Sequence, residues 1–240
     1  MRLDKLLSNM GYGSRKEMKK WLKSGTVLVD GKPAKDGKQQ VNPEQQTVTV
    51  NGEEVHYREF IYLMLNKPQG VISATEDGMH ETVIDLIDPD YHLFEPFPVG
   101  RLDKDTEGFL LLTNDGALAH DLLSPKKHVA KTYFARIKGN VTEDDIEAFK
   151  RGVTLDDGYH TKPGELVILS AGETSEIELT ITEGKFHQVK RMFQAVGKEV
   201  TFLKRLSMGP LELDKNLEPG EYRELTEEEL VQLKSRSSSS

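Results

Sequence analysis

A loop at residues 98–108 concentrates ionisable side chains between turn-forming residues and an apolar run. Its sequence, PVGRLDKDTEG, places Arg101 and Asp103 close to Asp105 and Glu107. An ionised carboxylate can act as a nucleophile or a general base, and a pair of carboxylates can hydrolyse a glycosidic bond. Carboxylates in such loops also cap helices and close turns. The pattern therefore leaves three readings of Asp103: a catalytic group, a turn-forming residue, or half of a glycosidase-like pair with Glu107.

A second group of ionisable residues lies on a segment with helical periodicity. The residues of its apolar stripe are Val189, Met192, Phe193 and Val196. At 100° per residue the opposite side carries His187, Lys190, Arg191 and Gln194. These polar side chains cannot all serve the core, so they are available to RNA or to a carboxylate. A solvated helix face is the alternative interpretation.

Several reaction classes are excluded by what the sequence lacks. There is no cysteine, which excludes a disulfide framework, a thiol nucleophile and a cysteine-ligated zinc site. The phosphate-binding, dinucleotide-binding, zinc-protease and serine-hydrolase motifs are absent, and the seven histidines show no metal-ligand spacing. We therefore expect neither a metal nor a cofactor.

The net charge hides strong local differences. Asp and Glu (40) outnumber Lys and Arg (32), so the formal charge is −8. Residues 1–40 nevertheless hold ten Lys or Arg against four Asp or Glu, and residues 126–138 hold five bases and no acid. Separated basic patches can present a positive surface to phosphate even on an acidic chain. Each patch alone is explained equally well as a solvated face.

The elements that must position these residues follow from periodicity. Helices are predicted at 3–10 and 14–25, the second opened by a Ser14–Glu17 capping box, and two hairpins turn at Asp30-Gly31 and Asn51-Gly52. From residue 60 onward strands alternate irregularly with short helices, without regular βαβ units. The fold class predicted is α+β, with a mixed, largely antiparallel sheet.

The predicted organisation is a small RNA-binding domain at 1–58, a catalytic domain at 59–233 and a disordered tail at 234–240. No apolar run is long enough for a membrane helix, and no signal peptide is visible. A cytoplasmic monomer without a membrane partner is therefore expected.

The first 37 residues resemble the S4 RNA-binding domain, through RLDKLLSNMGYGSRKEMKKWLKSGTVLVDGKPAKDG. The resemblance implies that structured RNA is a partner. Short helices that expose basic side chains bind the phosphate backbone with little sequence information. Arg15, Lys16 and Lys19 on the second predicted helix are the candidate RNA contacts in this segment.

The rest of the chain resembles the RsuA-type family of rRNA pseudouridine synthases. Four motifs occur in order: LNKPQG (65–70), VGRLDKDTEGFLLLTNDG (99–116), KTY (131–133) and EGKFHQVKRMFQAVG (183–197). The resemblance implies a mixed sheet with a central cleft for RNA, isomerisation of uridine to pseudouridine, and no cofactor. The segments SPKKHVAKTY, TKP and PGEYRELTEEEL are similar to the small-subunit (16S) rRNA branch.

The resemblance assigns roles residue by residue. The carboxylate on which catalysis depends falls on Asp103, the aromatic that packs on the target base on Tyr133, and the basic partner of the carboxylate on Lys190. Related synthases have Arg at this last position, so Lys190 supplies a point charge in place of a bidentate fork. Whether Asp103 acts as nucleophile or base stays open. Tyr133 as a core aromatic and Arg101 as a structural ion-pair partner are the competing interpretations.

Further RNA contacts are predicted around these three residues. The complete set of RNA-binding candidates is Arg15, Lys16, Lys19, Lys67, Arg101, His187, Gln188 and Arg191. The expected partner is small-subunit rRNA or an assembly intermediate. A large-subunit rRNA synthase of the same family and a non-catalytic, S4-containing assembly factor remain as alternatives.

Overall fold

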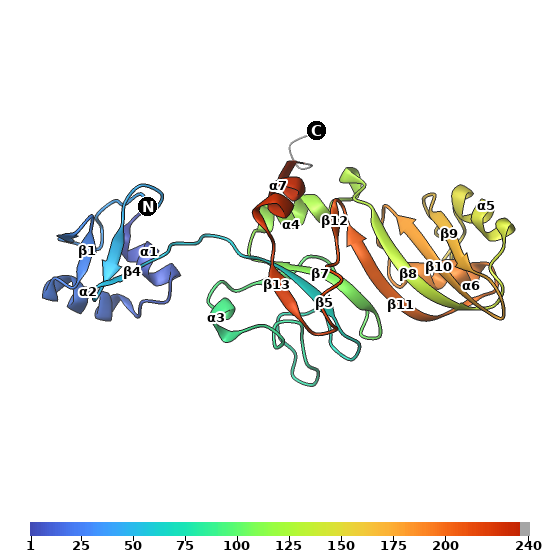
Figure 1. Cartoon of the computed structure of the whole chain (residues 1–240), viewed down its shortest axis with the longest axis horizontal. Coiled ribbons are helices and arrows are strands. Elements are labelled where there is room, and N and C mark those ends of the chain that lie inside the picture. Colours follow the sequence, from blue (N-terminus) through green and yellow to red (C-terminus); the bar gives the residue numbers. More distant parts are fainter. Residues whose placement is uncertain (236–240) are drawn as a thin grey trace. The chain divides into compact units, whose positions relative to one another are not determined.

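The structure is a computed structural model that describes residues 1–235, apart from the side chain of Arg15 (Figure 1). The chain divides into two compact units. The first contains residues 1–61 and 89–95, and the second contains the remainder. Of the predicted disordered tail, Lys234 and Ser235 belong to a helix, and 236–240 lie outside the described residues.

The first unit packs two helices against a four-stranded sheet of order β2-β1-β3-β4. Its elements are α1 (Leu3–Asn9), α2 (Arg15–Ser24), β1 (Val27–Val29), β2 (Lys32–Pro33), β3 (Val48–Val50), β4 (Glu53–Glu54) and the short helix α3 (Pro89–His92). Leu3, Leu6 and Leu7 of α1 are fully buried against Met18 and the valines of β1 and β3. The core is thus the apolar stripe of α1 placed on one face of the sheet.

Local signals in the first unit act as the sequence predicts. Ser14 and Glu17 form the capping box that opens α2, and Gly25 closes the helix in the left-handed conformation. Asp30 and Asn51 adopt positive φ together with the glycines that follow them, as tight hairpin turns require. These short-range interactions fix the ends of α2 and thereby the face on which its lysines stand.

The second unit is built on a nine-stranded sheet whose central order is β13-β5-β7-β11-β8-β10-β9. The strands are β5 (Tyr62–Lys67), β6 (Phe97–Pro98), β7 (Glu107–Thr113), β8 (Lys131–Lys138), β9 (Glu165–Ser170), β10 (Thr174–Ile181), β11 (Glu199–Met208), β12 (Leu211–Glu212) and β13 (Tyr222–Glu224). Every pairing is antiparallel except that of β7 with β11. The predicted α+β class with a mixed, largely antiparallel sheet is confirmed.

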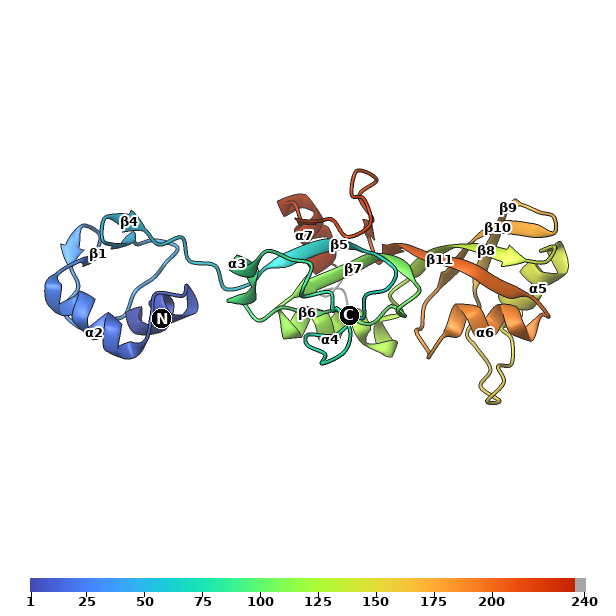
Figure 2. The ribbon, with the colours of Figure 1, turned by 90° about the horizontal axis from the view of Figure 1, so that it is seen from below.

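Short helices cover this sheet. They are α4 (Gly116–Leu123), a 3-10 turn (Pro125–Lys127), α5 (Glu143–Arg151), α6 (Gln188–Ala195) and α7 (Glu227–Ser235). Figure 2 shows α6 lying along one face of β8, β10 and β11. Val189, Met192 and Phe193 turn their side chains into this interface, as the periodicity predicts. No helix of residues 1–235 is both long and apolar enough to cross a bilayer.

The parallel junction of β7 and β11 requires a glycine. Gly108 lies opposite Arg205 and has a φ of +107°. A Cβ at this position would lie 2.2 Å from the backbone oxygen of Arg205 and 2.7 Å from its nitrogen. Only glycine permits both the φ and the close approach, so Gly108 joins the two halves of the sheet.

We expect Gly108→Ala to lower the free energy of unfolding by at least about 3 kcal/mol, because backbone atoms of β11 cannot yield as a side chain can. Urea denaturation followed by circular dichroism measures the loss. Gly116→Ala is the matched control, since its Cβ would meet no atom within 4 Å. A loss below about 1 kcal/mol for Gly108→Ala would contradict the requirement for close approach.

Candidate active site

The loop that carries Asp103 is fixed by its neighbours in the fold. It connects β6 to β7, and the side chain of Leu102 is buried beneath it. The hydroxyl of Ser73 accepts a hydrogen bond from the Leu102 amide and donates one to the Leu102 carbonyl, both at 3.0 Å. The Thr106 amide donates to the carbonyl of Asp103. The backbone on both sides of Asp103 is therefore held in place.

Lys67 supports the same loop from inside. Its ammonium donates to the carbonyl oxygens of Pro68 (2.9 Å), Thr106 (2.8 Å) and, more weakly, Lys104 (3.4 Å). Burial lowers the pKa of Lys67 to about 8, although the nearby carboxylates, led by Asp105, oppose the shift. The prediction that Lys67 contacts RNA is wrong, because its side chain is fully buried at the end of β5.

The ammonium of Lys190 lies between two carboxylates. Its Nζ is 3.0 Å from Oδ2 of Asp103 and 2.7 Å from Oδ1 of Asp105. His187 approaches the other oxygen of Asp103, with Nε2 at 3.3 Å from Oδ1. Asp103 is thus held on both oxygens by residues of the 187–190 segment.

The charges of this cluster stabilise one another. Burial by itself would lower the pKa of Lys190, but the hydrogen bonds to Asp105 and Asp103 outweigh it and raise that pKa. The hydrogen bond from Lys190 in turn lowers the pKa of Asp105. The carboxylate that shares Lys190 with Asp103 is Asp105, not the Glu107 of the glycosidase-like alternative.

Two other predicted RNA contacts are engaged within the protein. Gln188 lines the pocket but is buried, and it donates from Nε2 to Oε1 of Glu183 at 2.8 Å, so its contact with RNA stays a prediction. The guanidinium of Arg191 pairs with Asp156 and Asp157. Arg191 is therefore not the free cation that the helix pattern predicts, because the loop carrying these aspartates folds against α6.

A pocket of about 280 Å³ opens beside the cluster, within the second unit. Asp103, Lys190, His187 and Arg101 line it together with Tyr133. Tyr133 is 8% exposed and belongs to the buried side of β8, where alternate residues face the same way. The structure thus brings three of the four motifs to one cavity, while Lys67 of the remaining motif supports the loop from inside.

Two buried basic side chains to which the sequence analysis assigned no role also line the pocket. They are Lys131 and Arg205. In the antiparallel register of β8 and β11, Arg205 lies directly opposite Tyr133. Lys131 donates to the carbonyl of Val129, and Arg205 donates from Nε to the carbonyl of Phe109. The two-residue period of KTYFARIK already places Lys131 on the same side as Tyr133, a signal that could have identified it.

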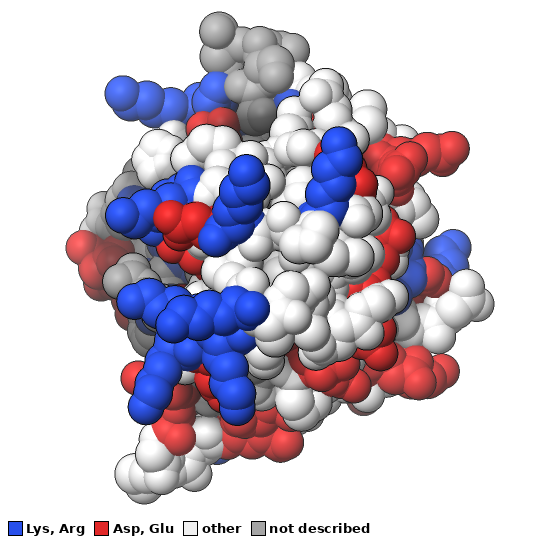
Figure 3. Space-filling model, turned by 90° about the vertical axis from the view of Figure 1, so that its left-hand side faces the viewer, with Lys and Arg blue, Asp and Glu red and all other residues white. Residues whose placement is uncertain are grey.

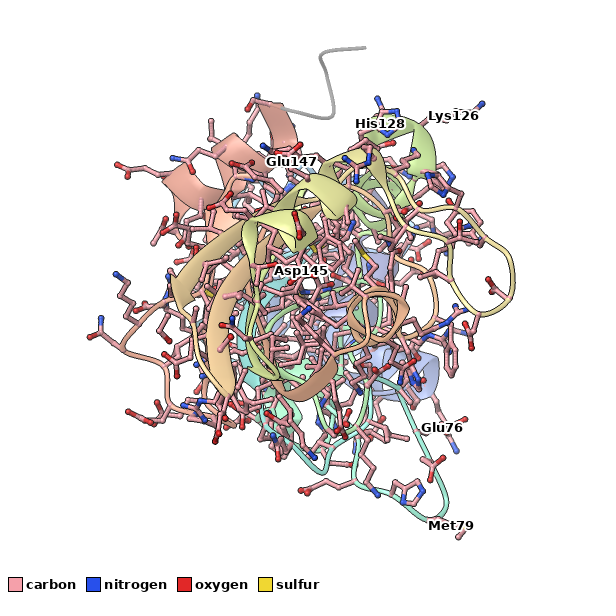
Figure 4. The ribbon with its side chains drawn as sticks, turned by 90° about the vertical axis from the view of Figure 1, so that its right-hand side faces the viewer. Glu76, Met79, Lys126, His128, Asp145 and Glu147 are labelled. Atoms are coloured by element: carbon pink, nitrogen blue, oxygen red, sulfur yellow. The ribbon has the colours of Figure 1, made fainter. Side chains whose placement is uncertain are left out.

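Two further basic side chains line the pocket, and one of them is exposed. Arg101 is exposed at its edge, and Lys162 on its lining lies with Nζ 3.0 Å from Nδ1 of His128. Figure 4 shows Lys126 and His128 together on the turn before β8. The basic window at 126–138 is therefore divided, with Lys126 on the surface and Lys131 inside.

A separate basic face belongs to the first unit. Lys16, Lys19, Lys20 and Lys23 of α2 are all exposed. Figure 3 shows lysine and arginine side chains gathered on the face that this unit presents. Positive charge on one side of a short helix is suited to backbone phosphates.

Replacement of Lys67 tests its support of the loop. We expect Lys67→Met to lower the free energy of unfolding by about 2 to 4 kcal/mol, because buried carbonyl oxygens lose their donor. Urea denaturation measures the change, with Lys104→Met, an exposed lysine of the supported loop, as the control. Equal stability of the two variants would show that Lys67 does not hold the loop.

Stability should depend on pH through Lys131. Burial, and then the charge of Arg205, lower the pKa of Lys131 to about 8 from its ordinary 10.5. Between these values the unfolded chain holds a proton that the folded chain lacks, so the free energy of unfolding rises with pH. We expect the wild type to gain up to about 1.4 kcal/mol per pH unit over Lys131→Met in this window.

Urea denaturation of both proteins from pH 7.5 to 10 measures the difference. Lys138→Met is the control, because Lys138 is exposed on the same strand and carries no burial penalty. A wild-type advantage that is flat with pH would contradict the predicted cost of charging Lys131.

Comparison with known proteins agrees with this geometry. Residues 61–195 match the RNA pseudouridylate synthase model, and residues 1–47 match the S4 domain. An uncharacterized RNA pseudouridine synthase of Bacillus subtilis is 64% identical, over 96% of this chain and 97% of that protein. The ribosomal small subunit pseudouridine synthase A of Vibrio cholerae is 42% identical, over 97% of this chain and 99% of its own.

A solved structure extends the likeness to three dimensions. The crystal structure of a pseudouridylate synthase superimposes with a TM-score of 0.68 at 36% identity, covering 97% of this chain and 99% of the other. The resemblance seen in the four motifs is confirmed over nearly the whole length. The chain therefore belongs to the RNA pseudouridylate synthase family and carries an amino-terminal S4 domain.

Proposed function

We propose that this enzyme converts a specific uridine of small-subunit rRNA into pseudouridine. The observation that carries the proposal is the contact of Lys190 with Asp103 at the pocket that Tyr133 lines. The relatives named ribosomal small subunit pseudouridine synthase A, which match nearly the full chain, support the choice of RNA. The monomeric state and the cytoplasmic location stay predictions.

The proposed reaction is an isomerisation, so the product has the same atoms and the same oxidation state as uridine. The C1′–N1 bond of uridine breaks, the uracil turns, and C1′ joins C5. The proton on C5 leaves to solvent, and N1 gains one. Asp103 attacks as a nucleophile or acts as a base on the sugar, and the ammonium of Lys190 lies 3.0 Å from its Oδ2. The charged groups nearest to this step are therefore the ammonium of Lys190 and the two carboxylates it contacts, Asp103 and Asp105.

Tyr133 is proposed to pack against the target base. A uridine inside a folded RNA must leave its stack before an enzyme reaches C1′, at a cost of a few kcal/mol. An aromatic ring in the pocket offsets that cost by stacking. Tyr133 lies on the lining, and Lys131 and Arg205 beside it add positive charge where an anionic nucleotide enters.

Binding of the RNA as a whole is assigned to the exposed basic residues. Charges farther apart than about 10 Å are screened at 0.1 M salt, so local patches decide contacts with phosphate more than the net charge of −8 does. Lys16 and Lys19 of the S4 domain are exposed and are proposed to contact backbone phosphates of the RNA. Arg101 at the pocket edge is proposed to hold a phosphate of the target nucleotide.

Tritium release tests the reaction and the role of Asp103 together. We expect the wild type to release tritium from small-subunit rRNA labelled at C5 of uridine, because that hydrogen is lost when C1′ joins C5. Asp103→Asn should lose release by at least about 1000-fold, since the amide cannot act as nucleophile or base. Circular dichroism of the variant controls for folding.

Other outcomes point to the alternatives. Release from large-subunit rRNA alone would assign the enzyme to that substrate. No release by the wild type from free rRNA or partly assembled subunits would favour the binding-only assembly factor. Full release by Asp103→Asn would show that the carboxylate assignment is wrong.

A further inference from the structure

Phe186 presents an apolar ring to solvent beside the proposed catalytic carboxylate. Its exposed fraction is 71%, and its ring stacks on that of His187, with centroids 3.7 Å apart and planes inclined by 21°. His187 is the residue whose Nε2 approaches Asp103. Exposing a phenyl ring forfeits the stabilisation that burial would give, and here the exposed ring is one residue from a contact to Asp103.

The turn that presents Phe186 is braced on both sides. The side chain of Gln188 accepts from the Lys185 amide and donates to Glu183, each at 2.8 Å. Arg191 donates from Nη1 to the carbonyl of Phe186 at 3.2 Å. His187 adopts φ +48°, a conformation that non-glycine residues adopt at a cost. The backbone of the turn is thus fixed by hydrogen bonds while the ring of Phe186 stays exposed, which indicates a binding surface.

A hollow of about 390 Å³ adjoins the ring. Phe186, His187 and Lys190 line one part of it, and His187 and Lys190 also line the main pocket. Asp156, Asp157, Arg191 and Gln194 complete the lining, and both carboxylates pair with the guanidinium of Arg191. The cations Lys190 and Arg191 are thus already paired with carboxylates, while the carboxylate oxygens and the amide of Gln194 can accept hydrogen bonds from base amino groups. The chemistry of the hollow therefore fits a nucleobase.

We infer that Phe186 is a stacking platform for the base of a nucleotide next to the target uridine, and that the hollow is a second base-binding site. The inference rests on the proposed function. When a uridine leaves its stack, its neighbours lose a stacking partner. An exposed aromatic ring replaces that partner for any base, since every base has a π-face. Phe186 is a positioning residue in this role.

Steady-state kinetics on tritium-labelled small-subunit rRNA test the inference. Phe186→Ala should raise KM about 5-fold to 100-fold, the range for loss of one base–aromatic stack, while kcat stays within about twofold. Phe186→Trp should restore KM because it restores a ring. Leu169→Ala is the matched control, since Leu169 is an exposed apolar residue on β9 outside the hollow.

Fluorescence provides a readout that a structural role would not move. The wild type has a single tryptophan, Trp21. Unlabelled small-subunit rRNA should quench the Phe186→Trp variant beyond any change in the wild type, because the new indole stacks on a base. No added quenching together with an unchanged KM in Phe186→Ala would overturn the inference.

The kinetic split separates stacking from support of the active site. A fall in kcat at constant KM would mean that Phe186 only steadies His187, which also overturns the inference. If the wild type releases no tritium, the proposed function fails by itself. The quenching titration then decides the stacking inference without reference to turnover.

Discussion

The ammonium of Lys190 between Asp103 and Asp105 is the interaction on which the proposed chemistry depends. Two carboxylates at one site repel each other, and a cation in contact with both, at 3.0 and 2.7 Å, offsets that repulsion. The ammonium of Lys190 is a compact point charge with three donors, which lets it contact both carboxylates of the loop.

That bridge joins the loop before β7 to α6, which packs on β11. Gly108 lets β7 lie against β11, and Lys67 binds the carbonyls of the loop that starts β7. Burial of Lys67 and Lys131 is unfavourable, as their lowered pKa values record. The hydrogen bonds to backbone carbonyls offset part of that cost. The buried ammonium of Lys67 thus holds the loop that carries the half-buried carboxylate of Asp103.

Much of the fold was predictable because its signals are local. The capping box at Ser14 and the hairpin turn at Asp30 involve residues at most three apart, so the sequence contains the whole interaction. The buried stripe of α6 follows from the 3.6-residue period alone. The same period could not predict the burial of Gln188, which depends on the turn formed by Glu183 and Lys185.

The residue types at the site, the element types that carry them and, through four ordered motifs, the family can all be recognised in the sequence. Which side chains meet depends on the folded arrangement of the strands and loops. Lys190 contacts Asp103 across 87 positions of sequence, Arg191 finds Asp156, and Lys67 points inward. The physical reason is range: helical and strand periods arise from neighbouring peptide units, whereas these contacts depend on strand order and on how each loop folds over the sheet.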